Sequence, residues 1–100
     1  MERLSELLKS KREKKRLLLR EVASRIEVDT ALISKIENND RMPTQEQLMK
    51  LSLTLEIDFD RLLILWYAEK IFEEIKDEAL APKILKMVLR KIKIRKTKWI

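Results

Sequence analysis

Four side chains that could make directional contacts lie close together in residues 30–35. Thr30 and Ser34 carry hydroxyls that donate and accept, Lys35 carries an ammonium donor, and Ala31 presents a bare methyl group. These groups suit non-covalent recognition of polar edges and methyl groups. The chain contains no Cys and no His, which removes the usual thiolate nucleophile, general base and metal ligand. We therefore expect a binding protein that uses no cofactor and no metal, and we do not expect an enzyme.

The apolar residues around this cluster predict two short helices. Leu19, Val22, Ala23 and Ile26 recur every three to four residues, which predicts a helix over about 19–26. Ile33 and Ile36 are the buried points of a second helix over about 30–38, with Asp29 as its N-cap. The four recognition residues, Thr30, Ala31, Ser34 and Lys35, then share the opposite, exposed face. Two short helices joined by a tight turn form the geometry that places a second helix in the DNA major groove.

The stretch resembles the helix-turn-helix domain of transcription regulators of the phage repressor, Cro and Xre type. The matching residues are Val22-Ala23, Ile26, Val28, Ile33-Ser34, Ile36-Glu37-Asn38 and Pro43, and the resemblance covers about residues 3–65. It implies that Thr30, Ala31 and Lys35 reach base edges. The alternative is an ordinary solvated helix face. It also implies a structural ion pair between Arg12 and Glu37, the alternative being an exposed Arg12 in a basic run.

Six further residues are candidate contacts to DNA phosphates: Lys14, Lys15, Arg16, Arg20, Asn38 and Arg41. Lys14, Lys15 and Arg16 close a predicted first helix over 2–15, where cations also suit the negative end of the helix dipole. For these three residues, a phosphate contact and stabilisation of the helix end both remain open. Arg20 begins its helix, where a cation opposes the dipole, and a phosphate contact would explain it. Arg41 is at a position where the resemblance implies a backbone contact.

The chain departs from the resembled family mainly in its lack of glycine. Glu27 replaces the glycine of the turn, Asn39 the glycine after the recognition helix, and Arg16 a frequent glycine between the first two helices. Glu27 must adopt a positive φ, which is strained for a non-glycine residue, or the turn must differ. Leu19 replaces a glutamine that often contacts phosphate, which removes one common contact.

Net charge is concentrated at the two ends of the 100 residues. Residues 1–25 carry nine Lys or Arg against four acids, and residues 77–100 carry eight against two, whereas residues 26–76 carry six against eleven. Clustered positive charge binds polyanions through counterion release, and solvation of helix faces is the plain alternative. No apolar run approaches the length of a membrane span, and we expect a cytoplasmic protein that does not use a membrane.

The rest of the chain predicts three more helices. Thr44 and Gln47 form a capping box that opens a helix to about residue 55, and a long fifth helix follows from Phe59 to about 76. Pro82 suits the first turn of a last helix, which could fold back, pair across a two-fold axis, or do both. Residues 90–98 could be its frayed end, an extended arm or a short strand. The expected fold is all-α: a five-helix repressor-like domain at 1–65 and a helical extension with a basic tail at 66–100.

Apolar residues occupy more than one face after residue 64, so one side needs a partner. We expect the dimer interface to contain Trp66, Tyr67, Ile71, Phe72, Ile75, Leu85, Val88, Leu89 and Ile92. The extension also looks, more loosely, like that of a subgroup of small bacterial regulators. The main hypothesis is a homodimeric regulator that reads a palindrome-like site on double-stranded DNA. The alternative is a helical module that uses residues 64–94 to hold a partner protein from a neighbouring gene, such as a toxin or a DNA-modifying enzyme.

Overall fold

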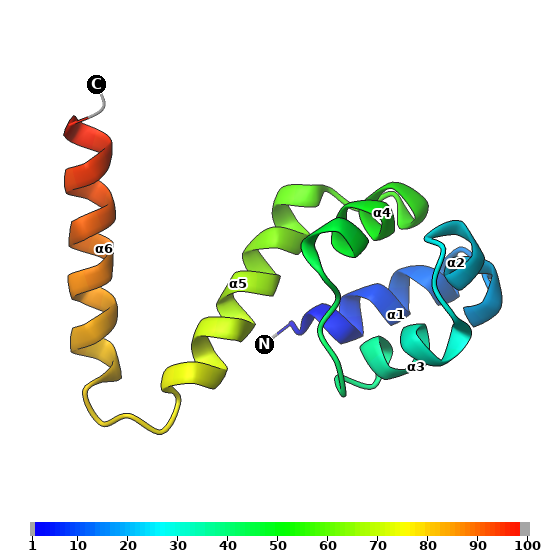
Figure 1. The fold of residues 1–100 in the computed structure, drawn as a ribbon, viewed down its shortest axis with the longest axis horizontal. Helices are drawn as coiled ribbons and strands as arrows, with labels where there is room; N and C mark the ends of the chain where they lie inside the picture. The colour runs from blue at the N-terminus through cyan, green and yellow to red at the C-terminus, as the bar shows by residue number, and fades with distance from the viewer. Residues whose placement is uncertain (1, 99–100) are drawn as a thin grey trace. The chain divides into compact units, whose positions relative to one another are not determined.

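The computed structural model describes the backbone of residues 2–98 and the side chains of residues 2–96. Within these residues it contains six α-helices and no strand (Figure 1). The helices are α1 (Leu4–Lys14), α2 (Leu19–Arg25), α3 (Thr30–Glu37), α4 (Gln45–Leu55), α5 (Phe59–Ile75) and α6 (Ala81–Lys98). The all-α prediction is therefore confirmed. Residues 90–98 continue α6, so they are neither an extended arm nor a strand, and residues 99–100 of the expected extension lie outside the described residues.

The chain forms two compact units, residues 1–70 and 71–100. The first unit extends past residue 65 because Trp66 and Glu69 of α5 still contact other elements of that unit. The indole Nε1 of Trp66 donates to the carbonyl of Pro43 at 2.7 Å, and the backbone N–H of Leu4 donates to Glu69 Oε1 at 3.3 Å. The ammonium of Lys70 lies 4.2 Å from the centre of the Trp66 ring. Burial raises the pKa of the Glu69 carboxyl, since the charged form is poorly solvated there.

One apolar core holds the first unit together. α2 packs against α3 and α4, and α1 packs against the same two helices. Its fully buried members include Leu4, Leu8, Val22, Ile26, Ile33, Ile36, Leu48, Leu55 and Leu62. Each element contributes residues spaced three or four apart, so every helix turns one stripe inward. α3 is thereby anchored through one face by Ile33 and Ile36, and its opposite face is exposed to solvent.

α1 to α4 each end in a left-handed residue that is not glycine. The φ angles are 56° at Arg16, 60° at Glu27, 62° at Asn39 and 55° at Glu56. After α2, Glu27 N–H donates to Ser24 and Val28 N–H donates to Ala23 at 3.2 and 3.0 Å. These two bonds form a Schellman motif, which satisfies carbonyls that the helix end leaves unpaired. The turn between α2 and α3 therefore has the geometry that glycine usually provides, and Glu27 adopts the left-handed backbone conformation in spite of its steric cost.

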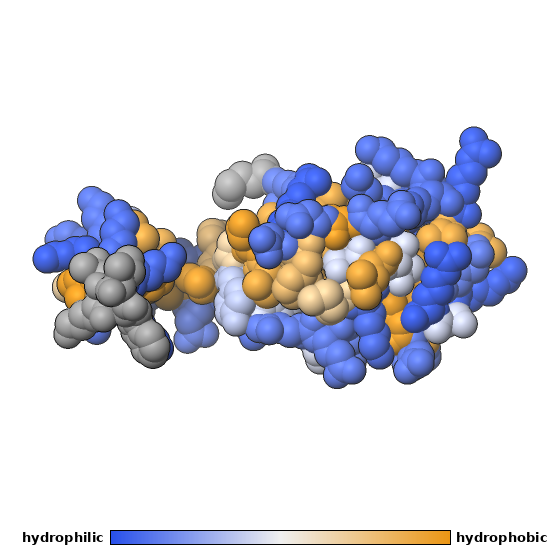
Figure 2. Space-filling view, turned by 90° about the horizontal axis from the view of Figure 1, so that it is seen from above, coloured by the Kyte–Doolittle hydropathy of each residue, from blue (hydrophilic) through white to orange (hydrophobic). Residues whose placement is uncertain are grey.

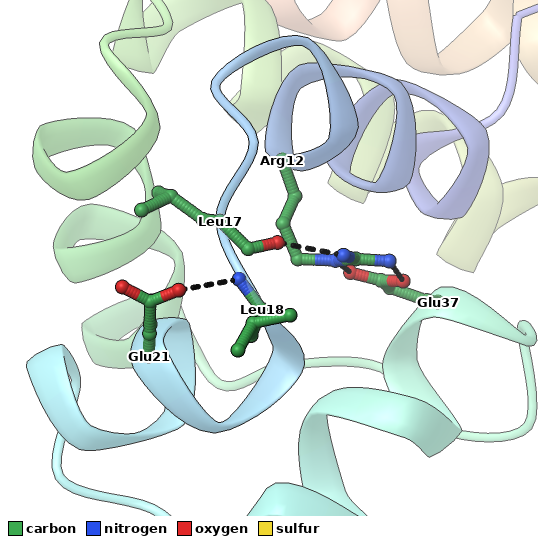
Figure 3. A network of polar contacts seen from close by, with 5 residues as sticks. All are labelled: Arg12, Leu17, Leu18, Glu21 and Glu37. Atoms are coloured by element: carbon green, nitrogen blue, oxygen red, sulfur yellow. Dashed lines mark hydrogen bonds and ion pairs between the residues drawn. The ribbon is translucent and has the colours of Figure 1, made fainter.

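An ion pair ties α1 to α3 (Figure 3). Arg12 Nε donates to Glu37 Oε2 at 2.6 Å and Nη2 donates to Oε1 at 3.0 Å, while Nη1 donates to the carbonyl of Leu17 at 2.8 Å. The two side chains are only 13% and 7% exposed. The hydrogen bonds to Glu37 raise the pKa of the Arg12 guanidinium above its ordinary value. Arg12 therefore fixes the end of α3 and the loop before α2 at once.

The second unit has little core of its own in the described chain. Most large apolar side chains of α6 are about half exposed, from 39% at Ile84 to 54% at Ile94. Hydrophobic and hydrophilic side chains both reach the surface there (Figure 2). An amphipathic helix with an uncovered apolar stripe gains stability by burying that stripe.

We expect the substitution Glu37→Gln to lower the free energy of unfolding by about 3 kcal/mol, because it leaves the Arg12 charge largely buried without its partner. Denaturant unfolding followed by circular dichroism measures the change. Glu73→Gln is the matched control, since the Glu73 carboxylate pairs with Lys76 at 3.0 Å on an exposed face and its loss should cost at most about 0.5 kcal/mol. Equal effects from the two substitutions would contradict a structural role for the buried pair.

We expect Glu27→Gly to stabilise the protein by about 0.5–1 kcal/mol, because relief of the left-handed strain exceeds the added unfolded-state entropy. Glu27→Ala is the matched control. It removes the same carboxylate, which lies 3.8 Å from Lys50, but keeps the Cβ that causes the strain. Denaturant unfolding of the three proteins should rank Gly above both others. Equal gains from Gly and Ala would show that charge, not backbone strain, limits stability here.

Candidate nucleic-acid interface

The exposed face of α3 carries the four residues expected to recognise base edges. Thr30, Ala31 and Lys35 are exposed, and Ser34 is half-buried. Asp29 caps this helix, as its Oδ1 accepts from the N–H of Leu32 at 2.8 Å. The cap fixes where the helix begins and therefore which side chains occupy its first turn.

Opposite this face, α3 is held rigidly by Ile33 and Ile36, each 2% exposed. The Arg12–Glu37 pair fixes its last turn. A recognition helix must hold its side chains within a fraction of an ångström of productive geometry. The exposed hydroxyls, methyl and ammonium of α3 can offer donors to guanine O6 and N7, hydrogen bonds to several bases, and contact with a thymine methyl.

The candidate phosphate contacts are all exposed, but their surroundings differ. Arg20 lies in the first turn of α2, which is also the positive end of that helix dipole. Asn38 and Arg41 follow the recognition helix directly, and Asn38 N–H donates to the carbonyl of Ser34 at 3.0 Å. An anion beside Arg20 or Arg41 would meet a guanidinium cation, and an anion beside Asn38 would meet a side-chain amide donor.

The C-terminal end of α1 holds the other three candidates, Lys14, Lys15 and Arg16. Lys15 forms an ion pair with Glu56, and the same pair lowers the pKa of Glu56 through its hydrogen bond and charge. A phosphate contact by Lys15 would have to replace that partner, so Lys14 and Arg16 are the better candidates. Arg16 is also the left-handed residue that ends α1, so its side chain leaves the helix where the loop begins.

The expected interface residues separate into two groups. The prediction that Trp66 belongs to the interface is wrong. Trp66 is only 7% exposed in the core of the first unit, and its indole N–H donates to the carbonyl of Pro43. Tyr67 is 47% exposed and accepts from Gln45 Nε2 at 2.8 Å. The remaining residues lie in the second unit, where all but the half-buried Ile75 are exposed: Ile71, Phe72, Ile75, Leu85, Val88, Leu89 and Ile92.

Several exposed apolar residues were missed by the sequence-based list of interface residues. Leu80, Met87 and Ile94 are 57%, 52% and 54% exposed. Leu80 falls in the loop before α6, and the other two lie off the main apolar stripe, so periodicity alone did not select them. Their own apolar side chains were the available signal. They widen the apolar surface of the second unit.

Two features bear on other kinds of site. Among residues 2–98, no group of three or more His, Cys, Asp or Glu side chains is arranged to hold a metal ion. None of the helices within the same residues is both long enough and apolar enough to cross a membrane.

Comparisons with known proteins agree with this geometry. A search of curated protein sequences finds no match. Among solved structures, a chain of the complex between the SinR protein and the SinI protein is similar, with a TM-score of 0.57 and 25% sequence identity over 94% of this chain and 98% of that one. The sequence matches the helix-turn-helix family over residues 8–62, which contain α2, α3 and the turn between them. The chain therefore belongs to the Cro/C1-type helix-turn-helix family of DNA-binding transcription regulators.

Proposed function

We propose that this protein regulates transcription by reading a specific DNA sequence with the exposed face of α3. One observation carries the proposal. Thr30, Ala31, Ser34 and Lys35 are presented together on a helix whose other face is locked into the core by Ile33, Ile36 and the Arg12–Glu37 pair. Side chains of these types can discriminate bases in the major groove. Arg20, Asn38, Arg41 and the end of α1 would add affinity through phosphates, which positions α3 but carries no sequence information.

The proposal includes a homodimer. The second unit exposes an apolar stripe along α6 that consists of Ile84, Leu85, Val88, Leu89 and Ile92. A two-fold axis lets the same stripe serve both partners. Two copies of α3 could then enter successive major grooves about 34 Å apart and read a palindrome-like site.

A second candidate is a module that holds a different protein through residues 64–94. Two observations favour keeping it. The similar solved chain belongs to a complex of two named proteins, SinR and SinI. The apolar surface of the second unit, which includes Phe72 at 58% exposed, would accept an apolar helix of another chain as readily as its own copy.

We expect Lys35→Ala to weaken binding to a specific duplex about tenfold, because it removes a donor to a base edge. The specific duplex would be selected by the wild-type protein from a random pool, and fluorescence anisotropy would compare it with a scrambled duplex. Binding to the scrambled duplex should change much less. Arg20→Ala is the comparison variant, since loss of a phosphate contact should weaken both duplexes equally and reduce the salt slope by about 1. Equal losses for Lys35→Ala would assign Lys35 to phosphate instead.

We expect the wild-type chain to sediment as a dimer and Val88→Glu to sediment as a helical monomer, because the new carboxylate would fall within the apolar stripe. Analytical ultracentrifugation with circular dichroism measures both properties. Lys83→Glu is the matched control on the opposite face of α6 and should leave the dimer intact. A wild-type chain that is monomeric, aggregates alone and is solubilised by a co-expressed neighbouring gene product would support the partner-protein module.

A further inference from the structure

The face of α6 opposite its apolar stripe carries only positive charge. Lys83, Lys86, Arg90 and Lys93 recur at spacings of three, four and three residues, which places them along one face of the helix. All four are exposed. They span about 15 Å at 1.5 Å per residue. We refer to these four residues as the basic stripe of α6.

This pattern differs from that of a helix whose charges only keep it soluble. Solvated helices usually mix signs, so that residues three or four apart attract each other. α1 does so, with Glu6 and Glu13 among its basic residues. Residues 81–96 of α6 contain seven Lys or Arg and no Asp or Glu. Neighbours along the basic stripe therefore repel each other, and that repulsion opposes helix formation unless a polyanion neutralises it.

For Lys83, Lys86 and Arg90, the ion pairs between described residues supply no such partner. The apolar stripe, with Leu85 and Val88 about half exposed, faces the other way. A partner on the apolar stripe would therefore leave the basic stripe facing solvent.

We propose that the basic stripe of α6 is a second DNA-binding surface, which contacts the phosphate backbone and does not read sequence. The proposal rests on the DNA-binding function proposed for α3. DNA carries a negative charge about every 1.7 Å of its axis when both strands are counted, so a duplex segment as long as the stripe carries roughly nine phosphate charges on its two strands. Because α6 and α3 belong to one chain, even weak contacts by α6 would add affinity once α3 is bound, provided both can reach the same duplex.

Two further polyanionic or acidic partners could occupy the stripe and are outcomes of the test. One is an anionic membrane surface, which basic amphipathic helices can bind. The other is the acidic segment of a second copy, where Glu73, Glu74, Asp77 and Glu78 precede α6. Phosphate in a duplex is favoured because the chain already belongs to a DNA-binding family and α6 is tethered to its recognition helix.

The test is the salt dependence of DNA binding by the full chain carrying Lys86→Gln and Arg90→Gln. We expect the slope of log K against log salt to become shallower by about 2 per subunit, at about 0.9 for each lost phosphate contact. The change should be the same on the selected duplex and on a scrambled duplex of equal length. The ratio of affinities for the two duplexes should stay unchanged.

The matched control carries Lys91→Gln and Lys96→Gln. It removes the same charge from the same helix. Lys91 follows Ile84, and Lys96 follows Leu89, by seven residues, which is about two helical turns, so both lysines lie beside the apolar stripe. Its salt slope should stay close to that of the wild type. Circular dichroism and sedimentation check that both variants keep their helix content and association state.

Five results would overturn the proposal. Slopes that fall equally in both variants would mean that α6 contributes only net charge. An unchanged slope for the Lys86/Arg90 variant, with wild-type discrimination between duplexes intact, would refute the second surface and leave the function of α3 standing. If the Lys86/Arg90 variant lost binding to phosphatidylserine vesicles and kept its DNA salt slope, the stripe would be assigned to a membrane surface. If it lost self-association and kept that slope, the stripe would be assigned to the acidic segment of a second copy. A wild-type chain that binds no duplex would refute both this inference and the proposed function.

Discussion

The position of α3 depends on one buried charge pair. Arg12 reaches from α1 to Glu37 at the end of α3 and also donates to the carbonyl of Leu17 before α2. Three elements that are separate in sequence are thereby fixed to one guanidinium, whose planar fork matches the carboxylate in a bidentate geometry. Ile33 and Ile36 hold the same helix by burial of apolar surface, which is a non-directional interaction. The ion pair supplies the direction, so the exposed face of α3 is presented in a single orientation.

The chain builds its tight turns without glycine and accepts the strain. Four helix ends place Arg16, Glu27, Asn39 and Glu56 in the left-handed region, which costs about 1–2 kcal/mol for an ordinary residue. Asn39 tolerates this conformation best. The Schellman hydrogen bonds and the apolar core of the first unit must offset that cost. Arg16, Glu27 and Glu56 carry charge at these positions, whereas glycine would carry none.

Most of the fold could be predicted from the sequence because its helices obey local rules. The spacing of Val22, Ala23 and Ile26, and the capping box at Thr44 and Gln47, set boundaries that the structure reproduces within about two residues. Trp66 could not be assigned, because a Trp on a helix with several apolar faces fits a core or an interface, and only the hydrogen bond to Pro43 decides. The ion pair between Lys15 and Glu56 could not be predicted from the sequence either, since Glu56 is distant in sequence and exposed. The repulsion along α6 became apparent only when residues 90–98 proved to be helical.

The central claim is that the exposed face of α3 reads a specific DNA sequence. The most direct test is fluorescence anisotropy of the purified wild-type chain on the DNA upstream of its own gene and on a scrambled duplex, at several salt concentrations. The account predicts tighter binding to the native fragment, with a preference that persists as salt rises, because base contacts are less sensitive to counterions than phosphate contacts. Equal binding to both duplexes on this and on other candidate operators, with affinity that collapses as salt rises, would contradict it.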